Sequence, residues 1–339
     1  MSLEPVKKDR KSYLYWAITL ALAGVLLVLA LRSVDWKQTV AVLLEGRLDF
    51  LLLACLILNG SYFARSLRWR VLLSATQQIA PLDVYGATMV GYLGNDFLPA
   101  RAGELMRTVL LGRRTGLSQS FILGTIVTER IIDTLAVLGL GSVAILSLPV
   151  LSQMMPAELS NAIRVTGLVA IPVVLVLLLT GQAQSLFQRV LPRLPLSEGL
   201  SLRIVGALEN FGRGLQSFRH PGRALNLTAL TLAIWLMDAS AAVVVAQSLS
   251  LSLTIMEALF LMTALALSSA LPSTPGYLGV YQFVAVNLLP LFGLSPSDAL
   301  AHLIAFQASA YVVVTIWGLW GMWRLSTPVP PDTKPDMLA

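Results

Sequence analysis

Apolar positions in this chain form long runs that are separated by short polar intervals. An α-helix rises 1.5 Å per residue, so about 20 apolar residues cross a hydrocarbon core of roughly 30 Å. Runs that approach or exceed this length predict about six transmembrane helices, at 13–31, 48–63, 118–148, 163–180, 225–249 and 295–323. Six spans place both termini on the same side of a membrane.

The first run, 13–31, follows a basic N-terminal segment and has two readings. A cleaved signal peptide is one reading, but its apolar region is usually about 7–15 residues long. No small-residue cleavage motif follows this run. We therefore expect an uncleaved membrane anchor.

Two further apolar intervals, 84–111 and 257–292, contain helix-breaking residues and do not fit simple spans. The first contains Gly91, Gly94, Asn95, Asp96, Pro99 and Gly103, and the second contains Pro272, Pro275, Gly276 and Gly279. Backbone broken at membrane depth is tolerated only inside protein or beside a water-filled cavity. The pattern predicts a re-entrant helical hairpin in each interval, with a kinked full span as the alternative.

The two broken intervals share two short sequence motifs in the same order. Leu98-Pro99 and Gly103 match Leu271-Pro272 and Gly276, and Gly-Leu-Ser follows at 116–118 and 293–295. Both motifs are common in apolar sequences, so their chance occurrence is the alternative to an internal duplication. Transporters are often built from two related halves. We predict one membrane domain, 1–339, that contains repeats 48–148 and 225–325.

Composition and charge agree with a membrane protein. Hydrophobic residues make up 56% of the chain and charged residues 12%, with a mean hydropathy of +0.76, whereas soluble domains carry about 25% charge. The net charge of +6 does not come from a basic, aromatic-rich soluble face, so we expect no nucleic-acid partner. Lys and Arg instead gather in alternate intervals, which predicts an inner-membrane protein with both termini in the cytoplasm.

This orientation makes the two predicted hairpins enter from opposite faces, as an inverted repeat. The cytoplasmic segment 182–223 has one apolar stripe. It is expected to lie on anionic lipid headgroups or on the protein's own surface. The chain then ends in a Pro-rich tail, 326–339.

The second limb of each hairpin is expected to begin near Ala100 or Gly276, with its N-terminal amides inside the membrane. Such an end favours an anion, and Arg101 adds a charge able to bind phosphate or carboxylate in a forked contact. In the alternative reading, Arg101, Glu104 and Arg107 neutralise one another along the limb.

Ionisable residues also occur within the predicted span 118–148. Glu129, Arg130 and Asp133 are costly there unless they face a partner or water. They form either a structural ion pair or part of a site, with Glu129 as the proton carrier if transport is proton-coupled. The second break is uncharged, and its tyrosines either contact substrate or mark the membrane interface. The predicted headgroup site comprises Asn95, Arg101, Glu104, Arg107, Glu129, Arg130, Asp133, Gly276, Tyr277, Tyr281 and Gln282.

No cofactor or metal is expected. Cys55 is the single cysteine, and His220 and His302 are far apart in the sequence. The segment 112–116 lacks the Gly-Lys-Ser/Thr ending of a P-loop, which argues against direct use of ATP.

Three runs together resemble the lysylphosphatidylglycerol synthase transmembrane family. They are GNDFLPARAGELMR at 94–107, ERIID at 129–133 and PGYLGVY at 275–281. The family includes the flippase half of the multiple peptide resistance factor, which moves aminoacylated phosphatidylglycerol across the membrane. Its bifunctional members carry a C-terminal aminoacyltransferase domain. This chain ends soon after Trp323, so the resemblance implies the translocation half without the synthase.

The resulting hypothesis is a lipid flippase for an anionic or phosphate-bearing phospholipid, glycolipid, polyprenyl or hopanoid lipid. Membrane lipids are the expected partners, together with a second copy of the chain or a lipid-synthesis protein. A lipid-linked transferase is the first alternative, although the segment 182–223 offers only Glu198 and Glu209 for Mg²⁺. A non-transporting accessory subunit is the second alternative.

Overall fold

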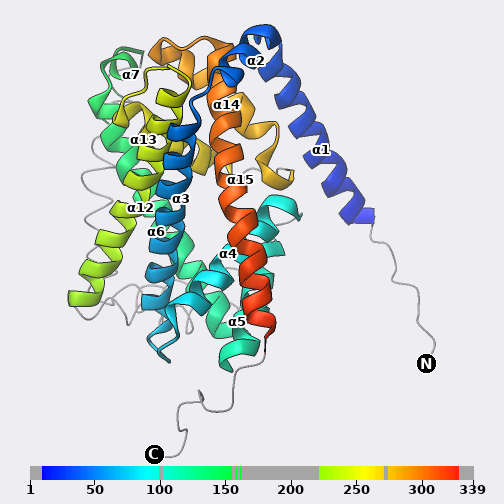
Figure 1. Cartoon of the computed structure of the whole chain (residues 1–339), viewed down its shortest axis with the longest axis vertical. Helices are drawn as coiled ribbons and strands as arrows, with labels where there is room; N and C mark the ends of the chain where they lie inside the picture. The colour runs from blue at the N-terminus through cyan, green and yellow to red at the C-terminus, as the bar shows by residue number, and fades with distance from the viewer. Residues whose placement is uncertain are drawn as a thin grey trace, which may run out of the picture.

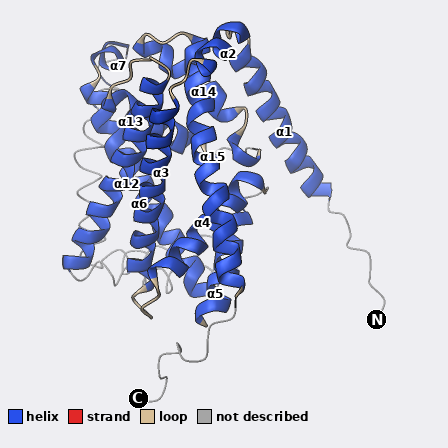
Figure 2. Cartoon of the chain, viewed as in Figure 1, coloured by secondary structure: helices blue, strands red, loops and turns tan. Residues whose placement is uncertain are grey.

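The protein is described by a computed structural model that covers residues 10–98, 102–154, 158, 161, 221–270 and 274–327. Every regular element in these ranges is a helix (Figure 2). The predicted span 163–180 lies outside the described residues, as do nearly all of the segments 182–223 and 326–339.

Five predicted spans correspond to helices. They are α1 (Arg10–Leu31), α3 (Leu48–Leu73), α6 (Gln119–Ser147), α12 (Pro221–Ser248) and α15 (Pro296–Ser326). A short helix α7 (Pro149–Met154) follows α6. By length and apolar composition, five helical segments of the described ranges could each cross a membrane: α3, α6, α12, α15 and Pro275–Phe292. The bent pair α1–α2 would be a sixth if it forms one span. The chain is therefore an all-α membrane protein.

The predicted first span, 13–31, ends where α1 ends, at Leu31. After α1, the helix α2 (Trp36–Leu44) turns by 84°. The side chain of Asp35 begins α2 by accepting a hydrogen bond from the amide of Lys37 at 2.8 Å, a standard N-cap. The amide of Asp35 donates to Ser297 Oγ at 2.8 Å, which ties the bend to the first turn of α15.

The first predicted hairpin is formed by α4 (Pro81–Phe97) and α5 (Ala102–Thr115), which pack along each other. Gly94 and Gly103 touch so closely that a Cβ on Gly94 would lie 2.5 Å from the Gly103 Cα. A Cβ on Gly103 would collide with the carbonyl oxygen of Gly91. These three glycines allow the two limbs to lie side by side.

The second broken interval also folds as helix, break and helix. It consists of α13 (Ile255–Ser268), the 3₁₀ turn η5 (Pro275–Tyr277), α14 (Val280–Leu288) and the 3₁₀ turn η6 (Leu289–Phe292). The second limb begins at Val280 rather than near Gly276, because Gly276, Tyr277 and Gly279 have positive φ angles of 67°, 58° and 88°. The 18 residues of Pro275–Phe292 are also long enough for a span, so re-entry stays a prediction.

The two breaks meet beside α15, at about the mid-height of the helices (Figure 1). A Cβ on Gly276 would lie 3.5 Å from the carbonyl oxygen of Asp96. The rings of Phe97 and Tyr311 have centroids 6.2 Å apart. Tyr311 donates a hydrogen bond to the carbonyl of Gly276 at 3.2 Å, so α15 braces this contact.

Helix packing pairs the elements of the two predicted repeats. The helices α3 and α12 pack against each other, α3 packs on α4, and α12 packs on α13. Likewise α15 packs on α4, and α6 packs on α13. Each contact of one set therefore has a counterpart in the other.

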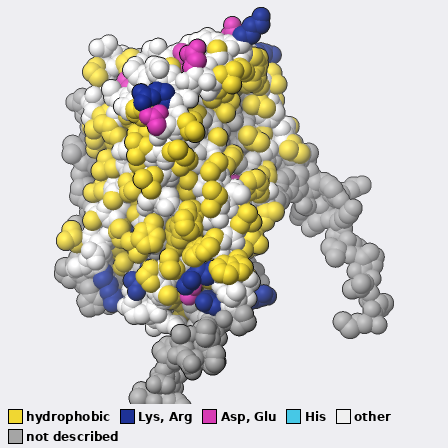
Figure 3. Space-filling model, viewed as in Figure 1, with side chains coloured by type: hydrophobic (Ala, Val, Ile, Leu, Met, Phe, Trp, Pro, Cys, Tyr) yellow, Lys and Arg dark blue, Asp and Glu magenta, His cyan; other side chains and the backbone are white. Residues whose placement is uncertain are grey.

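The described surface on the face seen in Figure 3 is apolar along most of its height, with charges toward the two ends. Leu52, Leu56, Ile316 and Leu319 are exposed by 57–67%. Such a band would be costly in water but matches the hydrocarbon core of a bilayer.

Candidate functional site

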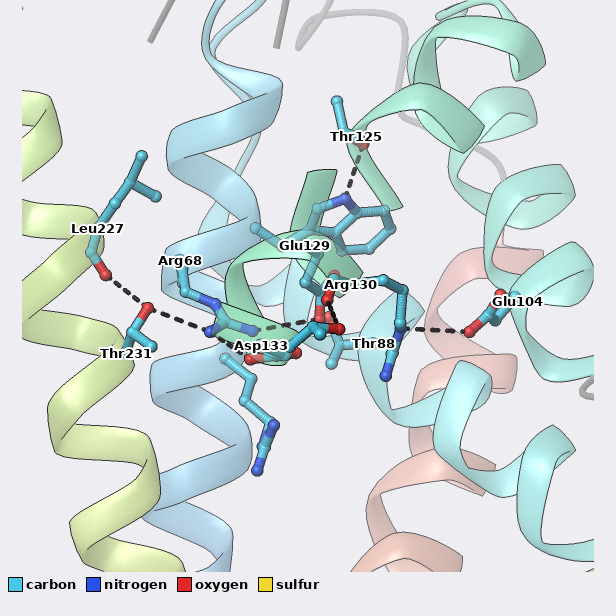
Figure 4. Close-up of polar contacts among 12 residues, drawn as sticks. Arg68, Thr88, Glu104, Thr125, Glu129, Arg130, Asp133, Leu227 and Thr231 are labelled. Atoms are coloured by element: carbon cyan, nitrogen blue, oxygen red, sulfur yellow. Dashed lines mark hydrogen bonds and ion pairs between the residues drawn. The ribbon is translucent and has the colours of Figure 1, made fainter. Parts of the chain in front are cut away.

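A buried group of charged residues lies where α3, α5 and α6 meet (Figure 4). Arg68 of α3 is 0% exposed and donates to Asp133 at 2.6 Å. It also lies 3.6 Å from a carboxylate oxygen of Glu129 and donates to the Thr231 hydroxyl of α12 at 3.2 Å. One arginine thus joins three helices.

Glu129 has a second arginine partner. Arg107 of α5 lies 3.3 Å from its other carboxylate oxygen, and the Arg107 guanidinium lies 4.6 Å from the ring centroid of Trp69. The Trp69 indole donates to Thr125 of α6 at 2.9 Å. Beside this group, Arg130 pairs with Glu104 at 3.4 Å in a more exposed position.

The six charges of this cluster balance, with three arginines and three carboxylates. Buried charges are costly unless they are paired, and this pairing lets the cluster sit inside the helices. Two hydrogen-bond donors of the cluster are unsatisfied: the Nε and one terminal nitrogen of Arg107 are buried without a hydrogen bond to the described protein. A polar group of a ligand, or water, would satisfy them.

The structure corrects two structural readings of the sequence. Glu104 and Arg107 do not neutralise each other along α5, because each pairs with α6. Arg130 does not pair with Asp133, whose partner is Arg68. Both corrections have one cause: the facing helix offers a closer partner than the next turn of the same helix. Arg101 lies outside the described residues.

The predicted residues of the second break form a separate, uncharged group. Gln282 accepts from the Gly279 amide at 2.7 Å and donates to Gln307 at 3.2 Å, and Gln307 donates to the Gly276 carbonyl at 3.3 Å. The rings of Tyr277 and Tyr281 stack with centroids 4.7 Å apart. These bonds hold the positive-φ turn in one shape.

Asn95 links the first break to its own hairpin. It lies in the last turn of α4, where its side-chain oxygen would be 2.8 Å from a Cβ on Gly103. This oxygen is buried and has no hydrogen-bond partner. Asn95 therefore stands at the α4–α5 contact rather than in the charged cluster.

Sequence reasoning missed several charged residues. It ended the second span at residue 63, before Arg65 and Arg68, but α3 continues to Leu73. Asp238 lies within α12 and pairs with Arg65 and with Ser61 Oγ. A three-residue spacing of Arg65 and Arg68 beyond an apolar run was the available signal, since it continues one helix face.

A third ionic group closes the open end of the first hairpin. Asp83 in the first turn of α4 pairs with Arg324 of α15 at 2.8 Å and with Arg114 of α5 at 3.4 Å. Among the described residues, no group of three or more His, Cys, Asp or Glu side chains is arranged to hold a metal ion.

Fold and cluster together define a class: a multi-helix integral membrane protein with two broken helical intervals and a buried, charge-balanced cluster beside one of them. Residues 16–318 match the family described as the lysylphosphatidylglycerol synthase TM region. The chain belongs to this family, as the sequence motifs predicted.

Two relatives are similar over much of the chain. A UPF0104 membrane protein of Methanocaldococcus jannaschii is 28% identical over 225 residues, which cover 66% of this chain and 90% of that protein. Glycosyltransferase AglD of Haloferax volcanii is 26% identical over 337 residues, which cover 90% of this chain and 54% of AglD. This chain thus spans about half the length of AglD.

Proposed function

We propose that the protein is a lipid flippase that moves a phosphate-bearing or otherwise anionic lipid between the leaflets of the cytoplasmic membrane. The observation that carries the proposal is the contact between the two breaks, Asp96 against Gly276. A lipid headgroup needs a polar route through the membrane, while its tails stay in the bilayer. Broken helices supply such a route, because their free backbone groups can replace water around the headgroup.

Helix packing supports two related halves. The contacts of α4 with α15 and of α13 with α6 are counterparts, and the hairpins open toward opposite ends of the bundle (Figure 1). Two inverted halves allow inward-open and outward-open states of similar energy, which alternating access requires. We assign the re-entrant geometry of both hairpins on this basis.

Orientation follows from the ends of the first hairpin. The open end of this hairpin carries three basic residues in the last turns of their helices: Arg113 and Arg114 of α5, and Arg324 of α15. Basic residues favour the cytoplasmic side. This end, and with it the chain termini, is therefore assigned to the cytoplasm.

The headgroup is assigned to the region between the charged cluster and the breaks. Arg101 precedes α5 directly, and a first-turn arginine beside helix amides binds phosphate oxygens well. Arg107 adds the buried, incompletely satisfied guanidinium nitrogens described above. No nucleotide is required, so movement is downhill or coupled to an ion.

The test is reconstitution in phosphatidylcholine vesicles that contain a trace of fluorescent phosphatidylglycerol. Dithionite added outside destroys only outer-leaflet dye, so extra loss reports flipping. Wild type should exceed empty vesicles, and Arg101→Ala should fall toward them. Arg47→Ala is the matched control, because Arg47 is 59% exposed and pairs only with the equally exposed Asp49 among the described residues. Equal dye loss in wild type, Arg101→Ala and empty vesicles would rule out the flippase.

A second candidate function is suggested by one relative. AglD is named a glycosyltransferase and aligns with 90% of this chain, so this chain is also a candidate membrane subunit for lipid-linked glycosylation. It would then hold the lipid while a partner transfers the sugar. Stable co-purification with a transferase, together with no flipping in vesicles, would favour this role over the flippase.

A further inference from the structure

Asp96 lies at the point where the two breaks touch. It is half-buried at the last turn of α4, and its carbonyl oxygen lies against Gly276 of the opposite break. The next residue, Phe97, lies near Tyr311 of α15, with the two rings tilted and their centroids 6.2 Å apart. Any opening or closing of the two breaks must change the surroundings of its carboxyl group.

Most other carboxylates in the described helices have a partner. Six pair with arginines, namely Asp49, Asp83, Glu104, Glu129, Asp133 and Asp238. Three more cap helix starts, namely Asp35, Glu257 and Asp298. Asp96 does neither within the part of the chain that the structure describes.

Among the described residues, the groups that interact with Asp96 carry no fixed charge. Its charge interacts with Tyr62 on α3 and Tyr311 on α15. Tyr92 lies beside Tyr62, and Tyr277 of η5 interacts with Tyr311. All four are tyrosines, which are neutral near pH 7.

Three charged groups on the described helices packed against α4 are already paired. On α3, Arg65 is paired with Asp238. On α5, Glu104 and Arg107 are paired with residues of α6. An ionised Asp96 is therefore stabilised by water rather than by a counter-charge of these elements.

Closing the breaks on each other removes that water, and burying an unpaired carboxylate is costly. A protonated carboxyl group can be buried at much lower cost. We infer that Asp96 is the proton-binding group of the flippase, which takes up a proton from water when the breaks close and returns it to water when they open. This inference rests on the proposed function and replaces Glu129, whose charge is already balanced by Arg68 and Arg107.

The first experiment measures flipping as a function of pH. Vesicles with fluorescent phosphatidylglycerol are held at the test pH, and the leaflet distribution is then read at one common pH. Wild type should flip several-fold faster at about pH 6 than at about pH 8.5, because a single carboxyl group changes its protonated fraction by up to about tenfold per pH unit. Asp96→Asn, which mimics the protonated group, should flip at nearly the same rate at both pH values.

Two further variants define what this result means. Asp49→Asn, in an exposed ion pair far from the breaks in sequence, should keep the wild-type pH profile. Arg101→Gln should lower flipping at every pH without flattening the profile. If Arg101→Gln flattens the profile as Asp96→Asn does, Asp96 is the ion-pair partner of Arg101 and the inference is wrong. An unchanged profile in Asp96→Asn also refutes it.

The second experiment does not depend on lipid movement. In a Cys55→Ser background, the thiol of Phe97→Cys is labelled with a membrane-impermeant maleimide across the same pH range. Leu44→Cys, at a site 81% exposed, corrects for the intrinsic pH dependence of the thiol. Labelling at 97 should fall at low pH, and adding Asp96→Asn should remove this dependence.

The two experiments separate the inference from the proposed function. If wild type moves no lipid but labelling at 97 depends on pH through Asp96, the flippase proposal fails and the proton-linked closure stands. If lipid moves and neither readout responds to Asp96→Asn, the inference fails and the flippase stands.

Discussion

Replacing Arg68 by methionine tests whether the buried charge cluster holds the helices together. Arg68 is fully buried and is the one ion-pair partner of Asp133 among the described residues, at 2.6 Å. The substitution keeps the apolar length of the side chain and removes the charge. Glu129 keeps Arg107 at 3.3 Å, so one carboxylate is left without a partner.

The cost can be worked from that one carboxylate. Removing one partner of a buried pair costs about 3–5 kcal/mol in soluble proteins, and an aspartate at a membrane helix centre costs about 2.5–3.5 kcal/mol. We therefore expect Arg68→Met to lower the free energy of unfolding by about 3 kcal/mol, or roughly a hundredfold in the folding equilibrium. Arg68→Met with Asp133→Leu removes the stranded charge and should recover most of the loss.

The assay is unfolding in mixed micelles titrated with SDS, followed by far-UV circular dichroism and tryptophan fluorescence. Arg47→Met is the matched control, because an exposed ion pair contributes about 0–1 kcal/mol. A loss below about 1 kcal/mol in Arg68→Met, or a double variant no more stable than the single one, would refute the proposed role of the cluster.

Three further predictions concern the hairpins. Gly103→Ala should destabilise the protein strongly, since its Cβ would collide with the Gly91 carbonyl, whereas Gly24→Ala meets open space and should be neutral in the same SDS titration. Gly276→Ala should reduce flipping more than Gly293→Ala. Both glycines have positive φ angles, but only at Gly276 would the new Cβ also collide with Tyr311. Equal flipping rates in the two variants would show that the break contact is not part of the mechanism. Asp83→Asn should loosen the open end of the first hairpin by weakening two ion pairs, seen as faster amide hydrogen exchange at the start of α4, and unchanged exchange would contradict this.

Much of the fold could be predicted from local signals. The predicted span 118–148 is α6 to within a residue at each end, because Ser118 caps its start and Pro149 follows its end. Ser295 similarly caps α15. Caps and long apolar runs depend on near neighbours, so a single sequence contains them.

The partners within the charged cluster could not be predicted in this way. Arg68 and Asp133 are 65 residues apart in sequence, and Arg65 and Asp238 are 173 apart. Without knowledge of helix packing, arginines at the end of an apolar run indicate a membrane boundary. The same residues can extend the helix when a facing helix supplies a carboxylate, and this difference made the predicted second span ten residues too short at its end.

The sequence placed residues of both breaks in one predicted site, but it did not identify which residues of the two breaks touch. Shared Leu-Pro and glycine positions predicted that both intervals are broken, and the structure confirms a break in each. The contact between Asp96 and Gly276 depends on how α4, α15 and η5 pack, which is a property of the assembled bundle.

The most direct test of the account is a reversible lock across the two breaks. Phe97 and Tyr311, whose ring centroids are 6.2 Å apart, are replaced by cysteines in a Cys55→Ser background and joined by a reducible, thiol-specific crosslinker. Crosslinked protein in vesicles should stop flipping fluorescent lipid, and reduction should restore it, while each single-cysteine variant treated with the same reagent keeps flipping. Undiminished flipping by fully crosslinked protein would contradict a lipid path that depends on movement of the breaks.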